Sequence, residues 1–201
     1  MLARLQRCCF AVVTITAITA GPNPAAADNP IVSIETTAGT ITAELFADQS
    51  PKTVENFLQY ARDGFFKGTV FHRVIPNFMV QAGGRDVNLA KKPTRDPIVN
   101  EASNGLKNDK YTLAMARTGD PNSATSQFFI NTADNNNLNR PQPDGHGYAV
   151  FGKVIEGTEV VDAIEQTPTG RHADPDFPAA MLSDVPVEPI KIESVTIVSG
   201  G

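Results

Sequence analysis

The stretch Phe71-His72-Arg73-Val74-Ile75-Pro76-Asn77-Phe78-Met79-Val80-Gln81-Ala82-Gly83-Gly84 decides how the rest of the sequence is interpreted. It contains parts of two short β-rich runs, residues 69–75 and 78–81. Arg73 lies between aromatic and aliphatic neighbours, and burying an arginine without a partner is costly. We therefore expect Arg73 either to be paired or to have a function.

Similar runs, rich in β-forming residues, occur on both sides of this stretch. They are 31–36, 40–46, 111–116, 127–132, 149–155 and 190–198, the last with a break in alternation near Ser194 that predicts a bulge. Two segments have apolar residues at helical spacing: residues 51–62, opened by Ser50-Pro51 and closed by Gly64, and residues 158–166. The proline-rich segment 167–189 is expected to be a long surface excursion. This pattern predicts a mainly β fold, a closed antiparallel barrel covered at its ends by two helices.

The first 27 residues have the pattern of a secretory signal peptide. Two arginines precede an apolar run at residues 10–20, and three alanines at 25–27 provide a cleavage site. A membrane anchor is the less favoured alternative, because the apolar run is shorter than the ~20 residues that span a bilayer. We expect a signal peptide at 1–27, a single domain at 28–201 and a soluble periplasmic product.

Charge and cysteine content narrow the classes of partner. Loss of Arg4 and Arg7 with the signal peptide would change the formal net charge from −5 to −7. An acidic chain without basic clusters is not expected to bind nucleic acid or anionic membranes. Both cysteines, Cys8 and Cys9, lie in the predicted signal peptide. The mature chain should therefore contain neither a disulfide nor a catalytic thiol.

Several common chemistries lack their sequence motifs. The three histidines, His72, His146 and His172, do not have metal-ligand spacing, and no glycine-rich nucleotide motif or GxSxG nucleophile motif is present. We expect neither a metal nor a cofactor.

Five blocks carry a resemblance to a known family. They are Ser50-Pro51-Lys52-Thr53-Val54-Glu55-Asn56-Phe57, Phe71-His72-Arg73-Val74-Ile75-Pro76, Phe78-Met79-Val80-Gln81, Ser126-Gln127-Phe128-Phe129-Ile130 and Val150-Phe151-Gly152-Lys153-Val154. In this order they resemble the cyclophilin family of peptidyl-prolyl cis–trans isomerases over nearly all of residues 30–198. The resemblance implies a closed eight-stranded antiparallel β-barrel capped by two α-helices. It also implies catalysis of rotation about X–Pro bonds without a cofactor.

The resemblance also implies a site. Its catalytic residues would be Arg73, Phe78 and Gln81, and its substrate-binding residues Met79, Ala116, Arg117, Phe129, Leu138 and Tyr148. The four residues Phe78, Met79, Phe129 and Leu138 would accept the proline ring. Gln81 would hydrogen-bond the substrate backbone, and the main chain at residues 116–117 would hold the peptide extended. Tyr148 would offer a polar tip on an apolar body, and His72 is expected to have a hydrogen-bonded structural role.

The expected partners are proline-containing unfolded or extended polypeptides, chiefly exported proteins that are folding, and the chain is expected to be a monomer. A peptide-binding chaperone module of the same fold without turnover is the alternative. Arg73 favours the enzyme, because a pure binder does not need it. A hydrolase is the last choice. Asn137 stands where many eukaryotic members carry a tryptophan that helps to bind cyclosporin, so weak cyclosporin binding is expected.

Overall fold

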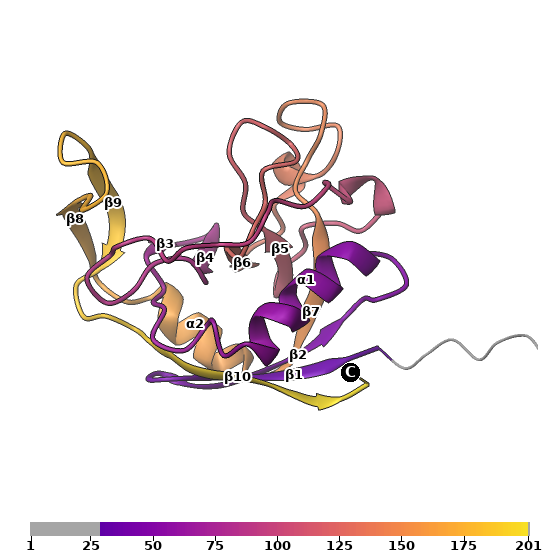
Figure 1. The fold of residues 1–201 in the computed structure, drawn as a ribbon, viewed down its shortest axis with the longest axis horizontal. Coiled ribbons are helices and arrows are strands. Elements are labelled where there is room, and N and C mark those ends of the chain that lie inside the picture. The colour runs from indigo at the N-terminus through magenta and orange to yellow at the C-terminus, as the bar shows by residue number, and fades with distance from the viewer. Residues whose placement is uncertain (1–28, 201) are drawn as a thin grey trace, which may run out of the picture.

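The computed structural model describes residues 29–200, so the predicted signal peptide and both cysteines lie outside the described residues. The elements run in the following order (Figure 1). They are β1 (Ile31–Thr36), β2 (Gly39–Leu45), α1 (Pro51–Arg62), β3 (Arg73–Ile75), β4 (Met79–Ala82), η1 (Ala102–Asn104), β5 (Thr112–Met115), β6 (Phe128–Asn131), η2 (Asn136–Leu138), β7 (Val150–Glu156), α2 (Thr158–Glu165), β8 (Thr169–Ala173), β9 (Met181–Pro186) and β10 (Ile192–Ser199). Within residues 29–200, none of the helices has the length and apolar character to cross a membrane.

Eight strands form one antiparallel sheet in the order β10-β1-β2-β7-β5-β6-β4-β3, which confirms a mainly β fold with two α-helices. The sheet curls around α1 and α2 into a half-barrel (Figure 1). Closure of the barrel is not confirmed, because β3 and β10 are its two edges. Between these edges, Gly68 N donates to Ile192 O at 2.8 Å and Phe71 N donates to Ile190 O at 2.9 Å. Thr69 O likewise accepts from Ile192 N at 2.8 Å. Residues 69 and 71 thus bond towards β10 rather than towards β4, and the strand predicted at 69–75 is shorter than expected.

The bulge predicted near Ser194 is confirmed in the pairing of β1 with β10. Glu35 lies opposite Ser194, but the next residue, Thr36, lies opposite Ile192. The register therefore passes over one residue of β10, as a bulge does.

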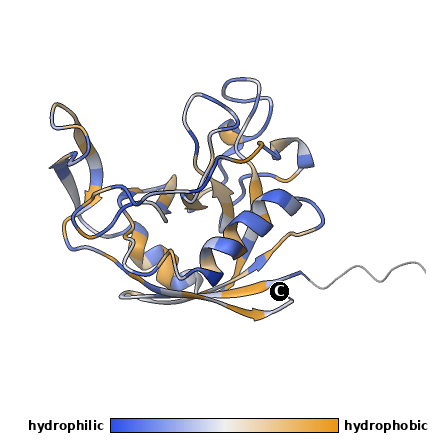
Figure 2. Ribbon diagram, viewed as in Figure 1, coloured by the Kyte–Doolittle hydropathy of each residue, from blue (hydrophilic) through white to orange (hydrophobic). Residues whose placement is uncertain are grey.

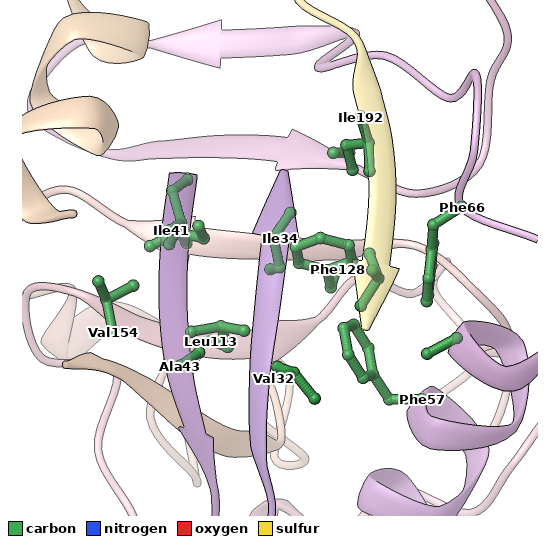
Figure 3. Packing of buried hydrophobic residues seen from close by; sticks show 14 of the residues in the cluster. Val32, Ile34, Ile41, Ala43, Phe57, Phe66, Leu113, Phe128, Val154 and Ile192 are labelled. Atoms are coloured by element: carbon green, nitrogen blue, oxygen red, sulfur yellow. The ribbon is translucent and has the colours of Figure 1, made fainter. Parts of the chain in front are cut away.

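The main hydrophobic core fills the curl of the sheet and is covered by both helices (Figure 3). Phe57 of α1 is its aromatic centre: its ring centroid lies 4.9 Å from that of Phe66 and 5.4 Å from those of Phe128 and Phe151. Helix α1 buries one face and exposes the other, so Figure 2 shows it largely hydrophilic on the side away from the core. The amphipathic spacing read from residues 51–62 thus corresponds to a helix with one buried face.

The N-terminus of α1 is stabilised differently from the prediction. Ser50 is the N-cap residue, but its hydroxyl does not cap the helix and instead donates to Val150 O at 2.8 Å. The carboxylate of Glu101 accepts from Lys52 N at 3.2 Å and from Thr53 N at 2.8 Å. A carboxylate at this end of a helix satisfies unpaired N–H groups and interacts favourably with the helix dipole.

The segment 167–189 is largely exposed, as expected of a surface excursion, but it is not a loop throughout. It contains the hairpin β8–β9, a separate two-stranded sheet that stands beside β3 (Figure 1). The buried Arg85 holds the hairpin through a bidentate pair with Asp174, at 3.1 and 3.0 Å, and a third contact with Asp176 at 3.0 Å. Sequence reasoning missed this arginine because its partners lie about ninety residues away.

Candidate functional site

The candidate site lies on the face of the sheet that points away from the main core. Side chains alternate between the two faces of a strand. The core face therefore receives Val74, Val80, Leu113, Phe128 and Ile130, whereas the residues between them point outward. The outward residues form one row of direct cross-strand neighbours. From β3 to β7 the row is Arg73, Gln81, Phe129, Ala114 and Val150.

All nine residues that the sequence assigned to the site line a single cavity of about 110 Å³ on this face. They are Arg73, Phe78, Met79, Gln81, Ala116, Arg117, Phe129, Leu138 and Tyr148. They come from β3, β4, β6, η2 and the segments next to β4, β5 and β7. The structure thus brings together residues that lie up to 75 positions apart in the chain, from 73 to 148.

The floor of the cavity is apolar and well packed. Met79 is 2% exposed, Phe129 4% and Leu138 7%, and they form a second hydrophobic cluster with Ala114 and Val150. Phe78, Ala116 and Tyr148 pack against this cluster but remain partly exposed. A small apolar cavity with a partly open rim is suited to a compact apolar ring.

Arg73 lies on the rim of the cavity. Strand alternation places it on the outer face of the edge strand β3, where it is exposed. Within residues 29–200 its side chain has neither a hydrogen bond nor an ion pair at standard distances. Its guanidinium donors are therefore available to a ligand in the cavity.

Gln81 is oriented by a second glutamine. Its Nε2 donates to Gln127 Oε1 at 2.9 Å, and Gln127 O in turn accepts from Ala116 N at 3.0 Å. Because the Ala116 N–H is used within the protein, its carbonyl and the main chain of Arg117 are the groups left to contact a peptide. Sequence reasoning did not assign Gln127 to the site, although it lies in one of the family blocks.

Arg117 meets the 139–147 loop with its side chain. The guanidinium pairs with both carboxylate oxygens of Asp144, at 2.9 and 2.8 Å, and its carbon lies 4.4 Å from the ring centroid of Tyr148. Burial alone would raise the pKa of Asp144, but hydrogen bonds from Arg117 and from His146 N–H hold that pKa below its ordinary value. Asp144 is therefore ionised at neutral pH.

Three buried asparagines form a hydrogen-bond network next to the cavity, and sequence reasoning missed them. Asn131 Nδ2 donates to Asn108 Oδ1 at 3.2 Å, and Asn135 Nδ2 donates to Asn131 Oδ1 and to Phe78 O, both at 2.7 Å. This network ties η2, which carries Leu138, to the strand that follows Phe78. Consecutive asparagines at 135–137 are typical of a loop, so their pattern did not indicate that Asn135 is buried.

His72 is buried next to Arg73. Its Nδ1 has no hydrogen-bond partner of standard geometry among the described residues. The Val70 backbone and the Gln127 side chain nevertheless interact with the imidazole and favour its protonated form, so the expected hydrogen-bonded structural role stays a prediction. Burial lowers the pKa of His72 to about 4, and the charge of Arg85 acts in the same direction. The imidazole is therefore neutral at physiological pH. Residues 29–200 contain no group of three or more His, Cys, Asp or Glu side chains that could hold a metal ion.

Comparisons with known proteins establish the family of this chain. The family model for cyclophilin type peptidyl-prolyl cis-trans isomerases matches residues 31–197. A peptidyl-prolyl cis-trans isomerase of Acinetobacter baylyi is 52% identical over 171 residues, 85% of this chain and 87% of that protein. Peptidyl-prolyl cis-trans isomerase B of Escherichia coli is 49% identical over 169 residues, 83% of this chain and 99% of that protein. A crystal structure of a cyclophilin type isomerase from Cryptosporidium parvum, in the presence of the dipeptide Ala-Pro, is similar with a TM-score of 0.63 at 31% identity, covering 84% of this chain and 99% of that one. This chain belongs to the cyclophilin family of peptidyl-prolyl cis–trans isomerases.

Proposed function

We propose that the cavity lined by Arg73 and the apolar floor is the place where this isomerase rotates X–Pro peptide bonds. The observation that carries the proposal is the position of Arg73. A permanently charged donor, without a partner in the described part of the chain, stands on the rim of a small apolar cavity, opposite Gln81 on the neighbouring strand. The family match supports peptidyl-prolyl isomerisation as the activity of the chain.

The chemistry needs a donor that acts during rotation. Amide resonance gives the X–Pro bond a barrier of roughly 18–20 kcal/mol, so the uncatalysed exchange takes tens to hundreds of seconds. When the amide twists, the lone pair of the prolyl nitrogen becomes localised and can accept a hydrogen bond that the planar amide cannot. A bond from Arg73 to that nitrogen would therefore stabilise the transition state more than the substrate.

Arg73 alone would not supply the whole acceleration. A hydrogen bond to a charged group is worth roughly 1.5–3 kcal/mol, which is about one to two decades in rate. The remainder would come from holding the two sides of the bond in the rotated geometry. We assign the proline ring to the floor formed by Met79, Phe129 and Leu138, with Phe78 at its edge, and the substrate backbone to Gln81 and the main chain at 116–117.

The ligand class follows from the size and character of the cavity. A floor that is almost fully buried suits a ring that has no charge and no N–H donor. The related isomerase from Cryptosporidium parvum was crystallised in the presence of Ala-Pro, which supports a proline-containing peptide as the ligand here. We propose unfolded or extended proline-containing polypeptides as the substrates.

The sequence pattern at residues 1–27 supports export of the protein from the cytoplasm. We propose that this segment is a cleaved signal peptide and that the mature monomer assists the folding of exported proteins in the periplasm. A fusion of residues 1–35 to a reporter that is active only after export would test this. Retention of the reporter in the cytoplasm would contradict it.

The alternative, a peptide-binding module without turnover, shares the fold and the cavity. A protease-coupled assay on an Ala-Pro peptide separates the two, with Arg73→Ala as the test and Arg62→Ala as the control, since Arg62 is exposed on α1 and does not line the cavity. We expect wild type and Arg62→Ala to accelerate exchange equally and Arg73→Ala to lose about one to two decades. A wild-type protein without acceleration, or an Arg73→Ala variant as fast as wild type, would overturn the proposal.

A further inference from the structure

The side chain of Arg117, two residues after the end of β5, is buried and fully engaged in hydrogen bonds. Only 3% of it is exposed, and all three of its nitrogens donate within the protein. Nε and Nη2 both donate to Gly147 O at 3.0 Å, Nη1 donates to Thr118 O at 3.0 Å, and Nη2 also pairs with Asp144. Because its nitrogens are engaged, the guanidinium is poorly placed to donate to a substrate.

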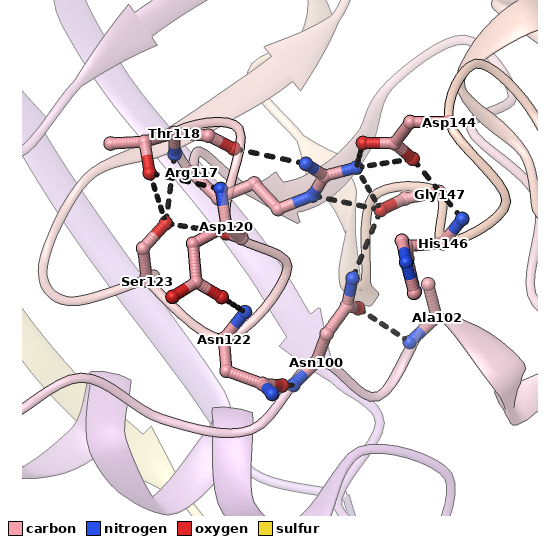
Figure 4. A network of polar contacts seen from close by, with 10 residues as sticks. All are labelled: Asn100, Ala102, Arg117, Thr118, Asp120, Asn122, Ser123, Asp144, His146 and Gly147. Carbon is pink, nitrogen blue, oxygen red and sulfur yellow. Dashed lines mark hydrogen bonds and ion pairs between the residues drawn. The ribbon is translucent and has the colours of Figure 1, made fainter.

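These bonds converge on one end of the 139–147 loop. Figure 4 shows the fork of Arg117 directed between the Asp144 carboxylate and the Gly147 carbonyl. The same carbonyl accepts from Asn100 Nδ2 at 3.1 Å. Gly147 is buried and its φ is +70°, and a Cβ there would meet Arg140 N at 2.6 Å, so the loop closes tightly at this point.

Tyr148 is the residue that follows this anchor. One side of its ring faces the Arg117 guanidinium, whose carbon is 4.4 Å from the ring centroid. The ring also meets Phe129 edge to face, with centroids 5.9 Å apart and an interplanar angle of 74°. Phe129 belongs to the cavity floor, so Tyr148 is held between the floor and the cation.

We infer that Arg117 and Asp144 are positioning residues that fix Tyr148 as one wall of the cavity, and that the Arg117 side chain acts on the substrate through Tyr148. This inference rests on the proposed function of the cavity. Asp144 was not assigned to the site from the sequence, and at residue 117 only the main chain was expected to hold the peptide. The inference adds a positioning role for Asp144 and for the Arg117 side chain.

The chemistry of the two groups explains why this pair suits the task. Asp144 is ionised, and a planar guanidinium can bind both of its oxygens while its face remains free to stack on an aromatic ring. A lysine has a point charge and could not do both at once. Without the pair, the loop and Tyr148 would sample other positions. This would weaken the binding of the peptide more than it would slow the rotation of the bound peptide.

A double-mutant cycle tests the inference. We expect Arg117→Ala to raise KM for an Ala-Pro peptide about tenfold with a smaller change in kcat, since one cation–π contact and one charged pair are lost. In a Tyr148→Ala background the same Arg117→Ala change should have little further effect. If the two changes multiply, Arg117 acts on the substrate independently of Tyr148 and the inference is wrong.

Conservative variants separate positioning from general stability. Arg117→Lys should behave nearly as poorly as Arg117→Ala although it keeps the charge, and Asp144→Glu should recover most of the binding lost in Asp144→Ala. Arg62→Ala, which removes an exposed surface pair, should leave KM unchanged. Full activity in Arg117→Lys or in Asp144→Ala would overturn the inference, while an inactive wild-type protein would instead overturn the proposed function.

Discussion

Arg73 and Gln81 lie directly opposite each other on β3 and β4, and both side chains point to the face that carries the cavity. The next pair along the ladder, Val74 and Val80, points into the main core and is fully buried. The polar pair is therefore fixed in place by an apolar pair one residue away. A one-residue slip of either strand would exchange the two faces, so core packing sets the register of the site.

Gln81 offers a first test of this arrangement. We expect Gln81→Ala to raise KM for an Ala-Pro peptide by about five- to tenfold, because one hydrogen bond to the substrate backbone is worth about 1 kcal/mol. Gln127→Ala should have a smaller effect of the same kind, since it frees the Gln81 amide without removing it. The measurement is steady-state kinetics of the isomerase reaction.

The control for Gln81 is Gln59→Ala on the exposed face of α1, which should leave both kinetic constants unchanged. If Gln127→Ala alone were as harmful as Gln81→Ala, and the double variant worse than either, Gln127 would contact the substrate itself. That result would contradict the supporting role assigned to it.

Glu101 tests the stabilisation of α1. We expect Glu101→Ala to lower the free energy of unfolding by about 1–2 kcal/mol, because two helix N–H groups and the Thr53 hydroxyl lose their acceptor. Urea denaturation measures this change. Glu55→Ala, which removes an exposed pair with Arg62, should cost less than about 1 kcal/mol. Equal losses in the two variants would show that the Glu101 contacts do not stabilise the helix.

Much of the architecture and the whole cavity lining could be predicted from the sequence. A composition rich in β-forming residues located the strands, with clear alternation where only one face is buried, as in β2. Helical spacing located α1 because Phe57 and its neighbours pack into the core. The cavity residues were assigned through the family resemblance, which rests in part on contiguous motifs such as the two adjacent blocks that contain Arg73 and Gln81. Local patterns therefore sufficed to predict residues of strands that have core residues on one face and cavity residues on the other.

The rest depends on contacts between segments that are distant in sequence, which local patterns do not encode. Glu101 reaches the N-terminus of α1 across 48 residues, and Asp174 reaches Arg85 across 89. The prolines of 167–189 suggested a loop because they predict local breaks, whereas the hairpin is held by the distant Arg85. Asp144 was missed for the same reason, since its partner Arg117 lies 27 residues away.

Of these contacts between distant segments, the pair of Arg85 with Asp174 should contribute most to stability. Removing one member of a buried ion pair leaves its partner buried without compensation, so we expect Arg85→Ala to cost about 3–5 kcal/mol of unfolding free energy. The double variant Arg85→Met/Asp174→Leu should lose less than Arg85→Ala, because an apolar pair leaves no buried charge. Limited proteolysis should also cut the β8–β9 hairpin of Arg85→Ala faster.

The matched control for Arg85 is Arg95→Ala, which breaks a pair with Asp63 at the surface and should cost less than about 1 kcal/mol. A double variant less stable than Arg85→Ala would show that the buried pair contributes net stability beyond charge compensation. It would contradict the expectation.

His72 should make stability depend on pH. Burial lowers the pKa of His72 from 6.5 to about 4. Between these values the unfolded chain binds a proton that the folded protein does not, so stability is full above pH 6.5 and falls as the pH drops towards 4. At pH 5 the loss should be about 2 kcal/mol relative to pH 7.5. Urea denaturation at several pH values measures it.

The variant His72→Gln should remove this part of the pH dependence, because a glutamine at this position does not titrate. His172→Gln is the control: its side chain is exposed, and it should keep the wild-type dependence. Carboxylates such as Asp174, whose pKa is lowered chiefly by its hydrogen bond from Arg85, also reduce stability at still lower pH and do so in all three proteins. The difference between His72→Gln and wild type from pH 7.5 to 5 therefore isolates the imidazole. Parallel curves for these two proteins would mean that His72 accepts its proton as easily in the folded state as in the unfolded chain.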